Sequence, residues 1–140
     1  MTESATKALQ QLQVIWGALV GGVVLYTVLI FSLITAGVLD VATFDPDVMT
    51  FVGAGVMVYM VAALIVRRSM VAAIPADADP DTRVSRYKVA TIVPMALMES
   101  GGLLLVSLAI LTGAATWALA GGGAAAVLMF FARPSADELG

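Results

Sequence analysis

Four long apolar stretches separated by short polar segments dominate the pattern of this chain. They cover residues 12–39, 48–66, 89–111 and 116–132, and Glu99 carries the only charge inside them. A helix of about 20 residues crosses the hydrocarbon core of a bilayer. The backbone of a lipid-exposed segment must also satisfy its own hydrogen bonds, which favours helices. The pattern therefore predicts an all-α membrane protein: a single four-helix transmembrane domain over residues 1–140, with a polar loop at 67–88.

Composition strengthens this interpretation. The 140 residues are 61% hydrophobic and 12% charged, with a mean hydropathy of +1.01. Soluble domains carry about 25% charged residues. The formal net charge of -3 comes with no clustered basic stripe, so nucleic acid is not an expected partner. The expected surroundings are the lipid bilayer.

The distribution of charge predicts the orientation. All 7 Lys and Arg residues lie before the first stretch, after the fourth or in the 67–88 loop. The positive-inside rule puts such segments in the cytoplasm. We therefore expect both termini and the long loop to be cytoplasmic, in a bacterial inner membrane. The first stretch is about twice as long as the apolar region of a signal peptide, so we interpret it as a retained helix.

The polar segments carry signals for helix starts. Asp45, Pro46 and Asp47 have the order of an N-cap, a first-turn proline and a first-turn acid. In the longer loop, Asp77, Asp79 and Asp81 have the one-three-five spacing of a calcium loop. With Asp77 as the first position of such a loop, the sixth and twelfth positions are Thr82 and Lys88 instead of the required Gly and Glu. The alternative interpretation is a polar linker whose last acids cap the following helix.

The missing residue types exclude several chemistries. The chain has no Cys and no His, so it has no thiol or imidazole nucleophile and lacks the usual zinc and haem ligands. A paired-carboxylate protease needs two acids in the membrane, where this sequence has Glu99 alone. We therefore expect no enzyme, no cofactor and no metal site. The methionine pairs Met57 with Met60 and Met95 with Met98 indicate core packing more than copper binding.

Glu99 is the strongest candidate for a functional residue. Counting along its stretch places it near the bilayer midplane, where an acid is costly and marks a functional site. No basic residue falls at the same depth on the other stretches, so we expect Glu99 to be protonated much of the time. Tyr59, Tyr26 and Thr27 fall at a similar level. They are its possible hydrogen-bond partners.

Small residues at helical spacing predict close helix packing. Gly and Ala faces let transmembrane helices approach one another, within a bundle or between subunits. The candidate packing positions are Gly17, Gly21, Gly53, Gly55, Ala96, Gly102, Ala118 and Gly122. These faces favour a homo-oligomer or contact with a membrane-protein partner.

The segment Pro94-Met-Ala-Leu-Met-Glu-Ser-Gly-Gly-Leu-Leu-Leu-Val106 resembles the carboxylate helix of the proteolipid, or c, subunits of rotary ATPases. In that family a mid-membrane acid follows small and apolar residues. The resemblance covers the second and third predicted helices and the loop between them. The first and fourth predicted helices lie outside it. It implies that Glu99 corresponds to the ion-binding carboxylate.

Two functions follow from the sequence. In the first, Glu99 binds or transfers protons or a small cation. In the second, the protein is a non-catalytic structural or assembly subunit of a homo-oligomer or of a larger membrane complex, and Glu99 holds helices together through a hydrogen bond.

Overall fold

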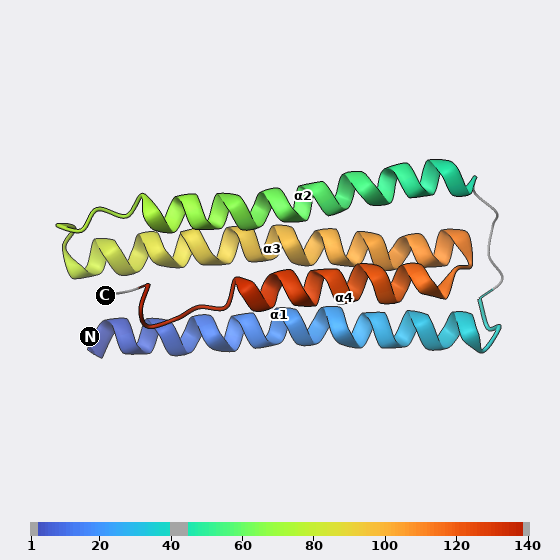
Figure 1. Ribbon diagram of the computed structural model, residues 1–140. Helices are drawn as coiled ribbons and strands as arrows, with labels where there is room; N and C mark the ends of the chain where they lie inside the picture. Colours follow the sequence, from blue (N-terminus) through green and yellow to red (C-terminus); the bar gives the residue numbers. More distant parts are fainter. Residues whose placement is uncertain (1–2, 40–44, 139–140) are drawn as a thin grey trace.

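The computed structural model describes residues 3–39 and 45–138 and is helical throughout its regular structure (Figure 1). The helices are α1 (Glu3–Thr35), α2 (Pro46–Ala72), α3 (Pro80–Thr112) and α4 (Ala115–Phe131). The first three are long and apolar enough to cross a membrane, whereas α4 has 17 residues and is shorter. The chain is thus an all-helical protein with membrane-spanning character.

Helix α3 is the centre of the bundle. It packs against each of the other helices, and α4 also packs against α1, while α1 and α2 make no contact in the described residues (Figure 1). Both described ends of the chain and the α2–α3 turn lie at the same end. We call it the basic end because it carries all the basic residues: Lys7, Arg67, Arg68, Arg83, Arg86, Lys88 and Arg133.

The helix ends follow the local signals in the sequence. The Asp45 carboxylate accepts a hydrogen bond from the Asp47 backbone N–H at 2.9 Å, which confirms it as the cap of α2. Asp79 caps α3 in the same way, accepting from the backbone N–H of Thr82 at 3.0 Å. These bonds satisfy amides that the first turn of a helix leaves free. The capping interpretation of the loop acids is therefore confirmed for Asp79, and the described residues contain no acidic cluster able to hold a metal ion.

The helices extend further into the polar segments than predicted. Most of the expected 67–88 loop is helical, because α2 continues to Ala72 and α3 begins at Pro80. Charged side chains mark where an apolar span ends, but Arg and Lys are good helix formers and do not end a helix. The first helix differs in both directions, running over 3–35 in place of 12–39. It ends where Gly37 adopts a φ of +66°, a left-handed cap that hydropathy alone does not detect.

Small residues allow the close approach of the helices. A Cβ atom on Gly53 would lie 2.5 Å from the Trp117 ring, and one on Gly102 would lie 2.5 Å from the Ala125 Cβ. Gly122 lies directly against the Thr27 side chain. Such contacts tolerate no side chain, so these glycines set the spacing of α4 against α2, α3 and α1.

The remaining small residues divide between the core and the surface. Ala118 is fully buried, and Gly101 and Gly121, which were not predicted as packing positions, lie against Met60 and Leu105. The other predicted positions do not pack against a neighbouring helix in this way. Gly17, Gly55 and Ala96 are exposed and Gly21 is partly exposed. A Cβ added to any of these three glycines would have no neighbouring atom within 4 Å among the described residues.

Candidate functional site

Glu99 lies near the middle of α3, on the side that faces α1. Its side chain is partly buried, and an added Cβ on Gly22 of α1 would be 3.8 Å from Glu99 Oε1. The Glu99 carboxyl group thus lies close to the α1 backbone at Gly22. Pro94, one turn earlier, is buried within the same continuous helix. The carboxyl group therefore sits at a helix contact, as the small residues around it in the sequence indicate.

Two of the three hydroxyl groups predicted near Glu99, those of Tyr26 and Thr27, bond to other partners. The Tyr26 hydroxyl is 3.2 Å from the Ser107 hydroxyl, two turns further along α3. Thr27 Oγ1 donates to the Val23 carbonyl of its own helix at 2.7 Å. Tyr59 is 40% exposed. Among the described residues, no hydrogen bond or ion pair reaches the Glu99 carboxyl group.

This arrangement leaves Glu99 without a fixed partner. The neutral acid can donate a proton to an incoming acceptor, and the carboxylate can accept one or bind a cation. Glu99 can adopt either the neutral or the ionised form, because no described group bonds to it and fixes one of these forms.

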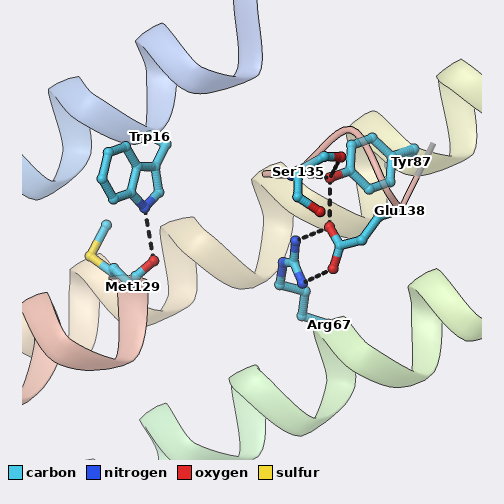
Figure 2. A network of polar contacts seen from close by, with 6 residues as sticks. All are labelled: Trp16, Arg67, Tyr87, Met129, Ser135 and Glu138. Atoms are coloured by element: carbon cyan, nitrogen blue, oxygen red, sulfur yellow. Dashed lines mark hydrogen bonds and ion pairs between the residues drawn. The ribbon is translucent and has the colours of Figure 1, made fainter. Parts of the chain in front are cut away.

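A second polar cluster, which we call the clamp, lies at the basic end (Figure 2). Arg67 of α2 donates from Nη1 and Nη2 to the two carboxylate oxygens of Glu138, at 3.0 and 2.7 Å. The Tyr87 hydroxyl of α3 donates to Glu138 Oε2 at 2.6 Å and accepts from the Ser135 backbone N–H at 3.2 Å. The clamp thus joins α2 and α3 to the segment after α4.

The clamp is buried and electrostatically matched. Arg67 is 2% exposed and Tyr87 is fully buried, so the guanidinium needs a counter-charge. Burial of Glu138 opposes its ionisation, but the hydrogen bonds from Arg67 and Tyr87 outweigh that effect and hold the pKa of Glu138 below its usual value. Glu138 is therefore a carboxylate at neutral pH and neutralises Arg67.

Sequence reasoning did not find the clamp. Arg67 and Glu138 are 71 residues apart, and Glu138 lies beyond the last apolar stretch, where acids are common on solvated tails. The available signals were weak: an arginine directly at the end of an apolar span and a tyrosine at the same level. Neither signal identifies its partner without the bundle.

The short helix α4 is held at its end by Trp16 of α1. The Trp16 indole N–H donates to the Met129 carbonyl at 2.8 Å, which adds a second donor to a carbonyl in the last turn of α4 that also accepts from the Ala132 backbone N–H (Figure 2). The Arg133 guanidinium lies 5.5 Å from the Trp16 ring centroid, in a cation–π contact. The chain therefore leaves α4 in a defined direction toward the clamp.

Comparison with family models, curated proteins and solved structures finds no match to this chain. The resemblance to proteolipid subunits consequently rests on the residues around Glu99 and stays a prediction.

Proposed function

We propose that this protein is a small integral membrane protein that binds or transfers protons, or a small cation, at Glu99. The observation that carries the proposal is a partly buried carboxyl group near the middle of a membrane-length helix, with no cationic or hydrogen-bonding partner among the described residues. A fixed structural acid would be bonded to a neighbour. Intramembrane acids of this kind mark ion pathways and proton relays.

The resemblance to proteolipid subunits implies the same chemistry for Glu99. The positive-inside rule places the basic end, with both termini, in the cytoplasm. Glu99 then lies about halfway between the two membrane surfaces, since a helix rises about 1.5 Å per residue. No catalytic or cofactor-binding role is proposed for any residue.

A hydrophobic carbodiimide tests this function, because it reacts with protonated carboxyl groups inside membranes. We expect an adduct on Glu99 whose yield falls as the pH rises through one midpoint, located by mass spectrometry. Glu138 is the matched acid in the same sample, and it should stay unlabelled because the clamp keeps it ionised. Absence of the Glu99 adduct at every pH in folded protein would reject a titrating site.

Transport is tested in vesicles that contain a pH-sensitive dye. We expect Glu99→Gln to abolish proton flux through the reconstituted protein while its helix content stays unchanged. Equal flux through the native protein and the variant would reject the role of Glu99.

The second candidate function is that of a structural or assembly subunit. It is favoured by Gly17, Gly21 and Gly55, where an added Cβ would have no neighbouring atom within 4 Å among the described residues. Small residues on an outer helix face suit contact with a second copy or another membrane protein. A strictly monomeric protein in mild detergent, measured by mass, would reject self-association.

A further inference from the structure

The segment after α4, residues 132–138, completes the bundle at the basic end. Helix α4 has 17 residues whereas α3 has 33, so α4 ends well before its neighbours do (Figure 1). Ala132 and Pro134 are buried, and Ser135 and Glu138 bond to Tyr87 and Arg67. We call this segment the strap. It occupies the corner of the bundle that α4 leaves open.

Buried polar atoms gather near the strap. In the described part of the chain, the buried side-chain atoms without a hydrogen-bond partner are Arg67 Nε, Arg83 Nε and Thr91 Oγ1. Arg83 and Thr91 lie one turn before and one turn after Tyr87, so these residues share one face of α3. The strap binds to this face through Tyr87, whose hydroxyl bonds to Glu138 and Ser135. Buried polar groups without a protein partner favour contact with water.

The strap is also held by a small number of polar contacts. Its side-chain bonds to the helices converge on the Glu138 carboxylate. The rest of its attachment is the hydrogen bond from the Ser135 backbone N–H to the Tyr87 hydroxyl, the packing of Ala132 and Pro134, and the contact of Arg133 with Trp16. Loss of the Glu138 carboxylate therefore removes both bonds to Arg67 of α2 and one bond to Tyr87 of α3 together, and leaves the bond between Ser135 and Tyr87. A segment fixed in this way opens as one unit.

We propose that the strap is a latch over the buried, unpaired polar atoms of Arg67, Arg83 and Thr91, and that its opening admits water to them and along α3 toward Glu99. Thr91 lies between the clamp and Glu99 on the same helix, about 12 Å of helical rise before the acid. The entry of water toward Glu99 rests on the proposed function. The latch itself concerns the basic end alone.

The natural absence of cysteine allows a direct test of the latch. Thr91→Cys is made in three proteins: one with the native strap, one that also carries Glu138→Gln and one that also carries Asp137→Asn. Each protein is treated with a charged, water-soluble methanethiosulfonate, and the rate of its reaction with the thiol is measured. Asp137 is the matched control because it is exposed and forms no ion pair with a described residue. The exposed Ser85→Cys variant gives the rate of an accessible thiol.

We expect slow reaction at position 91 with the native strap and with Asp137→Asn, and a rate about tenfold higher or more with Glu138→Gln, because the rate follows the population of the open state. Equal rates in the Glu138→Gln and Asp137→Asn proteins would overturn the latch. A rate at position 91 that already equals that of Ser85→Cys with the native strap would overturn it as well.

If Glu138→Gln alters the helix content, Tyr87→Phe replaces it. This variant removes the hydroxyl that bonds Glu138 and Ser135 but keeps the buried ring. We expect a smaller increase in the reaction rate at position 91, and an unchanged rate would overturn the latch.

A pair of carbodiimides tests the route to Glu99. A water-soluble carbodiimide should label Glu99 faster in Glu138→Gln than in Asp137→Asn, whereas a membrane-soluble one should label both proteins equally. Faster reaction at position 91 with no gain in water-soluble labelling would overturn the route. Failure of the proposed function looks different, since the membrane-soluble reagent would then leave Glu99 unlabelled at every pH.

Discussion

Replacing Glu138 by Gln should destabilise the protein through the charge that it leaves behind on Arg67. The Arg67 side chain is 3% exposed in the ion pair and has no other acidic partner among the described residues. Removing one member of a buried ion pair costs about 3–5 kcal/mol, since the remaining charge stays desolvated. The Glu138 side chain is 29% exposed, so water compensates part of this loss. We expect the free energy of unfolding to fall by about 2–3 kcal/mol.

A double-mutant cycle separates this effect from general damage to the strap. In Arg67→Met combined with Glu138→Gln no charge remains buried, and buried ion pairs are often replaced by apolar groups at little cost. The double variant should therefore be more stable than Glu138→Gln alone, with a coupling energy of about 2 kcal/mol between the two positions. Asp137→Asn should stay within about 0.5 kcal/mol of the native protein, as exposed substitutions do.

The assay is equilibrium unfolding in mixed micelles with an increasing fraction of denaturing detergent. Fluorescence of Trp16 reports the basic end and that of Trp117 the opposite end of the bundle. A loss of less than 0.5 kcal/mol in Glu138→Gln, or strictly additive effects in the cycle, would refute the reasoning that Arg67 depends on Glu138.

Two further predictions follow from the same structure. Because the pKa of Glu138 is lowered by its bonds to Arg67 and Tyr87, its contribution to stability is complete above the ordinary carboxyl value of 4.5 and is lost as the pH falls through the lowered value. Unfolding measured from pH 7 to pH 3 should show this loss in the native protein and a smaller one in Glu138→Gln, and parallel curves would contradict it. Gly122→Ala should cost about 1–3 kcal/mol, because its Cβ would overlap the Thr27 side chain. Gly21→Ala, with no atom within 4 Å, should cost nothing measurable in the same unfolding assay, and equal losses in both variants would contradict the packing argument.

The location of the helices could be predicted well because the signals are local. Long apolar runs predicted each helix, and the acid caps at Asp45 and Asp79 marked the starts of α2 and α3. The predicted ends were less accurate, since hydropathy records where a helix leaves the apolar phase and not where its hydrogen bonds stop. The extension of α2 through Arg67 to Ala72 is an example.

The contacts of the candidate site were less predictable because they depend on how each helix is rotated about its axis. Tyr26 lies at the expected level but is directed toward Ser107, and Tyr59 is 40% exposed with no hydrogen bond to Glu99. The same four-residue spacing of small residues, Gly17 with Gly21 and Ala118 with Gly122, did not distinguish the outward Gly17 from the inward Gly122. Depth follows from counting residues, whereas direction follows only from packing.

By itself, the sequence determined an apolar, helical chain with all its basic residues in segments that share one end and a single acid within its apolar stretches, since hydropathy, capping and charge are properties of neighbouring residues. Tertiary structure alone decided that α3 is central, that Gly22 faces Glu99, and that Glu138 returns to neutralise Arg67. These pairings join residues far apart in the chain. Their free energy exists only after the helices have packed and removed the paired groups from water.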